Sequence, residues 1–79
     1  MKLIYFSAPW CGPCKMLAPT MERSGLPFQK VNVDEDQTLS AKYGIRNVPT
    51  LVKVDSSGNE ISRLVGNNPL DKIKNWYNG

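Results

Sequence analysis

The two cysteines of this chain lie three residues apart, in Cys11-Gly12-Pro13-Cys14, and the sequence contains no histidine. Two thiolates alone cannot complete the usual four-ligand zinc site, so we do not expect a bound metal. A purely structural disulfide is not favoured either. Closing so short a loop restricts the unfolded chain only slightly and so stabilises the folded state by at most about 2 kcal/mol. The chemistry that remains is thiol-disulfide exchange, in which a dithiol and a disulfide interconvert.

Cys11 is the candidate nucleophile of this exchange. An ordinary thiol, with a pKa of about 8.5, is mostly protonated at neutral pH. Cys11 directly precedes a predicted helix, where unpaired N–H groups and the positive end of the helix dipole stabilise an anion. Pro13 suits a first helical turn, and Gly12 leaves room for a partner sulfur. We expect exposed Cys11 to attack a substrate disulfide, and the more buried Cys14 then to attack Cys11 and release the reduced substrate.

The elements that position this pair follow from the hydrophobic pattern. Residues 2–6 have the composition of a buried strand, and residues 28–33 have the β-rich pattern of a second one. A helix over residues 12–23 is predicted between them, since one face carries an apolar set at helical spacing: Cys14, Leu17, Ala18 and Met21. Strand, helix and strand in this order form a parallel βαβ unit with a right-handed crossover.

The second half of the chain predicts a short helix over residues 36–43 and an antiparallel pair of strands over residues 50–54 and 60–65. Asn68 and Pro69 are typical of an N-cap and a first helical residue. The last helix then has an apolar face made of Leu70, Ile73 and Tyr77. The predicted fold class is α/β, in the order βαβαββα, with a four-stranded mixed sheet flanked by helices and a single domain over residues 1–79.

Composition excludes several classes of protein. Hydrophobic residues make up 41% and charged residues 22% of the 79, which is typical of a globular domain rather than a disordered chain. The net charge of +3 comes from scattered lysines and arginines, whereas a nucleic-acid surface has a basic stripe. No apolar run approaches the roughly 20 residues of a membrane span, and no secretory signal pattern opens the chain. We expect a cytoplasmic monomer.

The segment from Trp10 to Lys15, WCGPCK, resembles the active-site motif of the thioredoxin family. Further segments recur in the order found in that family: VNVD at 31–34, KYGIR at 42–46, VPT at 48–50, and Gly66 before the last helix. The resemblance implies a thioredoxin-like fold and a protein-disulfide reductase with no bound cofactor. It also implies that NADPH supplies electrons through thioredoxin reductase, and that ribonucleotide reductase is a candidate among the disulfide-containing protein substrates.

The resemblance also implies a substrate-binding surface. Val48-Pro49 would be a cis peptide facing the cysteines, where the Val48 backbone pairs with a bound substrate chain; alternatively, Pro49 merely begins a strand. Trp10 would belong to the contact surface, or simply cover the rim of the core. Gly66 would end a turn and let a partner approach. Gly12, Pro13 and Lys15 would support the motif around Cys11 and Cys14.

The chain departs from the family pattern at several places. The family usually has an additional strand and helix before the strand that leads to the motif, so we expect a trimmed fold, closer in outline to a glutaredoxin. Tyr5 stands where the family commonly has a buried aspartate that helps deprotonate the second cysteine, and Lys30 aligns with the accompanying lysine. One hypothesis is that Tyr5 and Lys30, or water, move that proton; the alternative is that Tyr5 is plain core. Ser7 replaces an aromatic residue common in the family.

Two other functions remain open at this stage. A glutaredoxin-like protein would take electrons from glutathione, although the Gly12-Pro13 pair argues against it because glutaredoxins more often have Pro-Tyr there. A non-catalytic binding subunit would use the surface of Trp10, Val48-Pro49 and Gly66 without thiol chemistry. Replacing both cysteines by serine separates these functions, since only pure binding survives that change.

Overall fold

The computed structural model describes residues 2–79 as three helices and four strands in the predicted order βαβαββα. Every predicted strand and helix is present, and the predicted ends differ from the observed ones by no more than one residue. The elements are β1 (Lys2–Ser7), α1 (Gly12–Ser24), β2 (Phe28–Asn32), α2 (Gln37–Lys42), β3 (Thr50–Val54), β4 (Glu60–Val65) and α3 (Leu70–Asn78).

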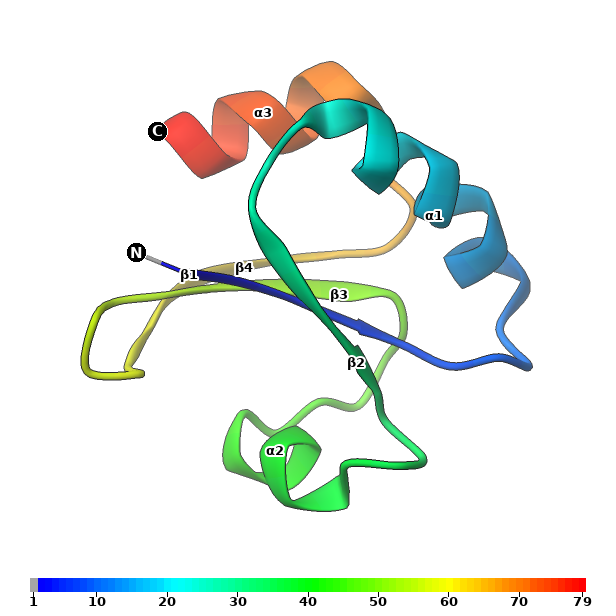
Figure 1. Cartoon of the computed structure of the whole chain (residues 1–79), viewed down its shortest axis with the longest axis vertical. Helices are drawn as coiled ribbons and strands as arrows, with labels where there is room; N and C mark the ends of the chain where they lie inside the picture. The colour runs from blue at the N-terminus through cyan, green and yellow to red at the C-terminus, as the bar shows by residue number, and fades with distance from the viewer. Residues whose placement is uncertain (1) are drawn as a thin grey trace.

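The four strands form one mixed sheet in the order β2-β1-β3-β4. Strand β1 pairs parallel with β2 and antiparallel with β3, and β3 pairs antiparallel with β4. Helices α1 and α3 cover one face of the sheet, and α2 covers the other (Figure 1). The predicted mixed sheet with helices on both faces is therefore confirmed.

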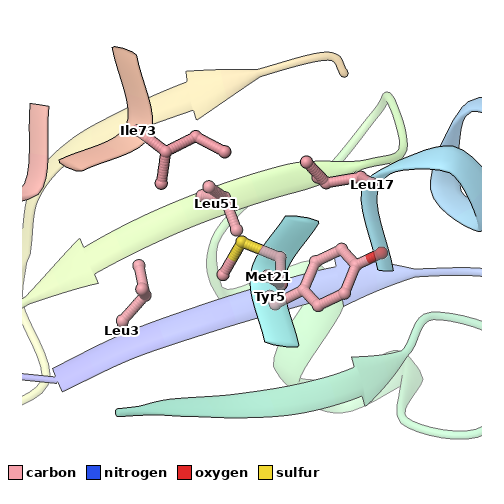
Figure 2. Packing of buried hydrophobic residues seen from close by; sticks show 6 residues of the cluster. All are labelled: Leu3, Tyr5, Leu17, Met21, Leu51 and Ile73. Carbon is pink, nitrogen blue, oxygen red and sulfur yellow. The ribbon is translucent and has the colours of Figure 1, made fainter. Parts of the chain in front are cut away.

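The core is divided by the sheet because successive side chains of a strand point to opposite faces. Leu3 and Tyr5 of β1 pack on the side of α1 and α3, together with Leu17, Met21, Leu51 and Ile73 (Figure 2). The next residues of β1, Ile4 and Phe6, pack on the opposite side against a cluster that includes Val31, Tyr43, Val52 and Val54. Strand β1 thus carries both halves of the core and leads directly to the cysteines.

The ends of the first two helices have clear local causes. Helix α1 ends at Gly25, whose φ of 70° is the left-handed conformation that glycine adopts readily. Helix α2 begins after Asp36, whose Oδ1 accepts a hydrogen bond from the N–H of Leu39 at 2.9 Å. Within residues 2–79, none of the helices combines the length and apolar character needed to cross a membrane.

The start of α3 differs from the prediction. Pro69 is the N-cap rather than the first helical residue, and no side chain caps the helix. Asn68 does not accept from the helix; instead its Nδ2 donates to the carbonyls of Val65 and Gly66, both at 3.0 Å. The prediction was wrong because the Asn68 amide satisfies the turn that leaves β4, an arrangement that depends on how the chain folds back.

Candidate active site

Cys11 and Cys14 are joined by a disulfide at the N-terminus of α1, with their Cα atoms 5.2 Å apart. Cys11 is the N-cap of the helix, and its Sγ accepts a hydrogen bond from the N–H of Cys14 at 3.1 Å. A helix N-terminus offers unpaired N–H groups and a positive dipole end. The sulfur of Cys11 therefore lies where a thiolate would be stabilised.

The expectation that Cys11 is exposed was wrong for this oxidised form. Cys11 is 5% exposed and Cys14 is 3% exposed, so the two residues are nearly equally buried. The physical reason is the packing of both cysteines with Ala8, against which Val33 and Val48 also pack. The N–H of Cys11 in addition donates to the carbonyl of Ala8 at 3.2 Å, which holds the loop close to the sheet.

The other residues of the motif lie in the first turn and are exposed. Pro13 stands in the first turn of α1, where its missing N–H leaves no helical hydrogen bond unmade. A Cβ built on Gly12 would meet no heavy atom within 4 Å, so the space beside the disulfide is open. Lys15 follows Cys14 and is exposed to solvent.

The Val48-Pro49 peptide bond is cis, the isomer that the resemblance implies. The Val48 carbonyl oxygen lies 3.5 Å from Cys11 Sγ, which places this peptide directly beside the disulfide. The carbonyl of Pro49 accepts a hydrogen bond from the N–H of Gly66 at 2.9 Å. Gly66 has a φ of 97°, a conformation that favours glycine. The structure thus brings Cys11, Val48-Pro49 and Gly66 together, although they are distant in the sequence.

Trp10 lies on the surface beside the cysteines with 67% of its area exposed, so it does not cover the core. Its indole Nε1–H donates a hydrogen bond to Oδ2 of Asp34 at 2.8 Å. We did not single out Asp34 as a site residue from the sequence. The predicted parallel pairing of β1 and β2 could have identified it, however. The residues that follow the carboxyl ends of parallel strands, here Trp10 and Asp34, lie at the same edge of the sheet.

Tyr5 belongs to the core and also contacts the active-site helix. Its side chain is buried, and its hydroxyl donates a hydrogen bond to the main-chain carbonyl of Cys14 at 3.0 Å. Burial raises the pKa of Tyr5 above its ordinary value of 10.0, and a hydrogen bond with Ser7 opposes this only in part. Lys30 Nζ lies 5.9 Å from the centroid of the Tyr5 ring, so the ammonium group faces the ring rather than being bonded to the hydroxyl.

Comparisons with known proteins agree with this geometry. The family model described as Thioredoxin matches residues 1–79. The chain is 38% identical over 82 residues to the thioredoxin of Haemophilus influenzae, covering 96% of this chain and 76% of that protein. It is 39% identical over 79 residues to the thioredoxin of Bacillus subtilis, covering 92% and 75% respectively.

Solved structures give the same result. The thioredoxin of Fasciola hepatica superposes with a TM-score of 0.86 at 33% identity, over 96% of this chain and 76% of that one. The thioredoxin of Plasmodium falciparum superposes with a TM-score of 0.84 at 32% identity, over 98% and 82%. The predicted fold class is confirmed, and neither the glutaredoxin-like nor the non-catalytic alternative is favoured. This chain belongs to the thioredoxin family and is a thiol-disulfide oxidoreductase.

Proposed function

We propose that the protein reduces disulfide bonds of other proteins with Cys11 as the nucleophile and Cys14 as the resolving cysteine. The observation that supports these roles is the hydrogen bond from the N–H of Cys14 to Cys11 Sγ at 3.1 Å. A sulfur that accepts this bond at a helix N-terminus is stabilised as a thiolate, which is the attacking species in exchange. Cys14 is buried in the first turn of α1, within bonding reach of Cys11.

The cycle balances in two exchange steps. The Cys11 thiolate attacks one sulfur of the substrate disulfide, and the other substrate sulfur leaves as a thiolate that takes a proton from solvent. Cys14, after losing its own proton, attacks Cys11 Sγ and displaces the second substrate sulfur. The substrate gains two electrons, and the protein is left with the Cys11-Cys14 disulfide of the present structure.

The binding surface for the substrate chain is proposed around this disulfide. The cis peptide of Val48 and Pro49 lies against Cys11 Sγ, and Gly66 is bonded to Pro49, so an extended substrate segment would pass beside this peptide. The open space at Gly66, where a Cβ would meet nothing within 4 Å, supports a close approach. Exposed Trp10, which directly precedes Cys11 in the chain, would add an apolar contact beside the nucleophile.

Electron supply and partners belong to the same proposal. The protein would bind no cofactor, and NADPH would recharge the disulfide through thioredoxin reductase. Its substrates would be disulfide-containing proteins, with ribonucleotide reductase as a candidate. The protein would act as a cytoplasmic monomer, and residues 1–79 would form one thioredoxin-like domain, which the family match over that whole range supports.

The test is NADPH oxidation with insulin as the disulfide substrate. The protein is assayed with thioredoxin reductase and, separately, with glutathione plus glutathione reductase. Turnover with the first system, abolished by Cys11→Ser, is the expected result. Cys14→Ser should instead accumulate a mixed disulfide between Cys11 and insulin, visible by mass spectrometry. Turnover only with glutathione, or a mixed disulfide that forms on Cys14 of Cys11→Ser at the same rate, would contradict the proposal.

A further inference from the structure

A pocket of about 540 Å³ opens to solvent beside the resolving cysteine. Neither Cys11 nor the Val48-Pro49 peptide lines it, so it is distinct from the substrate-binding surface proposed above. The polar and reactive residues that line this Cys14 pocket are Tyr5, Ser7, Cys14, Lys15, Lys30, Asn32 and Glu35.

The pocket exists because of the residue types on β1. Tyr5 and Ser7 are two apart in the strand, so both side chains lie on the face below α1. Figure 2 shows the Tyr5 hydroxyl directed toward that helix, where it bonds to the Cys14 carbonyl. Ser7, at the carboxyl end of β1, is too small to fill the space between the strand and Cys14. An aromatic side chain at this position would occupy it.

The resolving step requires a proton acceptor. Cys14 attacks as a thiolate, so its thiol must lose a proton while the mixed disulfide exists. Tyr5 is poorly suited to accept it, because its hydroxyl already donates to the Cys14 carbonyl and stays protonated. The two lysine ammonium groups have no lone pair, and the serine hydroxyl is not a base.

Glu35 is the only carboxylate that lines the pocket among residues 2–79. The side chain is exposed, and its Oε1 accepts a hydrogen bond from Nδ2 of Asn32 at 3.1 Å. The N–H of Glu35 also donates to the carbonyl of Asn32 at 3.0 Å. Asn32 lines the same pocket at the end of β2, so these two bonds hold the carboxylate beside it.

We propose that the Cys14 pocket is the proton exit of the resolving cysteine, and that Glu35 accepts the proton through water that enters from solvent. This inference rests on the proposed role of Cys14 as the resolving cysteine. The proton of the Cys14 thiol passes to the Glu35 carboxylate and then to solvent, as Cys14 Sγ bonds to Cys11 Sγ and the substrate sulfur leaves. The other titratable groups that line this pocket are Tyr5 from β1, Lys15 from α1 and Lys30 from β2.

The two exchange steps can be observed separately. Reduced protein is mixed with an aromatic disulfide whose released thiolate absorbs light, in a stopped-flow instrument. The first equivalent of thiolate reports the attack of Cys11, and the second reports the attack of Cys14. Glu35→Gln removes the base and keeps the shape, whereas Ser7→Trp fills the pocket. Glu22→Gln, an exposed carboxylate on α1 outside the pocket, is the matched control.

The expected result is a second phase slowed roughly tenfold in Glu35→Gln and in Ser7→Trp, with the first phase unchanged. Acetate, at constant pH and ionic strength, should restore the second phase of Glu35→Gln because a small carboxylate can enter the open pocket. It should not restore Ser7→Trp, and it should not affect Glu22→Gln. If Ser7→Trp does not fold, the second-phase rate of Glu35→Gln, measured with and without acetate, is sufficient to test the proposal.

Two outcomes would overturn the inference while leaving the proposed function intact. One is a second phase in Glu35→Gln as fast as in the unmodified protein. The other is a slowed second phase that acetate does not restore, since that would indicate a structural effect rather than a lost base. The absence of a first phase in every variant, by contrast, would count against Cys11 as the nucleophile and thus against the proposed function itself.

Discussion

The indole of Trp10 is held by Asp34 although two thirds of the Trp10 surface is exposed. The hydrogen bond from Nε1 to Oδ2 is 2.8 Å long and joins the loop after β1 to the loop after β2. A large exposed side chain would otherwise sample several rotamers, and fixing it in a substrate complex costs entropy. Asp34 therefore orients the exposed indole beside Cys11, which we propose as a substrate contact, before a substrate arrives.

Removing this restraint should weaken substrate binding. For Asp34→Ala we expect KM for insulin to rise about two- to fivefold with kcat nearly unchanged, which corresponds to a hydrogen bond of about 0.5–1 kcal/mol. The reaction with a small aromatic disulfide, which does not need the Trp10 surface, should keep its rate. Asp71→Ala on α3 is the control. Equal losses with both substrates would mean that Asp34 acts on the cysteines rather than on docking.

Tyr5→Phe should destabilise the oxidised protein. The change removes the buried hydroxyl that donates to the Cys14 carbonyl at 3.0 Å, and such a bond contributes about 1 kcal/mol. Urea unfolding followed by circular dichroism measures the difference. An unchanged midpoint would show that the carbonyl is satisfied equally well by water.

The difference in stability between the unmodified protein and Tyr5→Phe should also depend on pH. Because burial raises the pKa of Tyr5, the unfolded tyrosine ionises near pH 10 while the folded one does not. The contribution of Tyr5 to stability is complete below pH 10 and is lost as the pH rises further. The gap in stability between the unmodified protein and Tyr5→Phe should therefore narrow above about pH 10.

The turn between β3 and β4 should contribute to the loss of stability in acid. Hydrogen bonds from the main-chain N–H groups of Asn59 and Ser57, each 2.9 Å long, lower the pKa of Asp55 below its ordinary value of 3.8. Stability from this carboxylate is present above that value and is lost as the pH falls below about 4. Asp55→Asn keeps an acceptor oxygen without titrating. Its thermal midpoint should approach that of the unmodified protein between pH 5 and pH 2.5; a constant gap would exclude this role.

Local pattern accounts for what could be predicted of the fold. The buried strand β1 follows from its continuous apolar run, and the apolar face of α1 follows from the spacing of residues along the helix. Short connections then restrict how neighbouring elements pair. The CxxC pair and its helix N-terminus were predictable for the same reason. The nearness of Gly66 to Pro49 was implied only by resemblance, since it depends on the β3-β4 register.

The features that escaped prediction all involve neighbours from other parts of the chain. Cys11 is buried because Ala8 and Val48 converge on it, and neither contact is visible in the spacing of the motif. Asn68 bonds backward to the turn after β4 rather than forward to α3. The Cys14 pocket results from a small residue beneath a helix, and so it requires the packed structure.

The burial of Lys53 is a further feature that the sequence did not predict, because a lysine in the middle of a strand is usually expected to reach solvent. It is 5% exposed and lies on the same face of β3 as Leu51, beneath α3. Its Nζ donates to the carbonyls of Trp76 at 3.0 Å and Tyr77 at 3.2 Å, and lies 5.3 Å from the centroid of the Trp76 ring. The ammonium group thus bonds to carbonyls at the negative end of the α3 dipole.

Lys53→Met should therefore destabilise the protein by about 1–3 kcal/mol, because methionine retains most of the side-chain volume but leaves the carbonyls of Trp76 and Tyr77 without this donor. The effect should be local as well as global: the substitution should accelerate amide hydrogen exchange more in the last turn of α3 than in α1. Lys72→Met, on the exposed side of α3, controls for the loss of one positive charge and should change the urea midpoint little. If both variants lose stability equally, the change in net charge is responsible. If only Lys53→Met has a lower urea midpoint, and amide exchange in α3 is unchanged, then Lys53 stabilises the core without fixing the end of the helix.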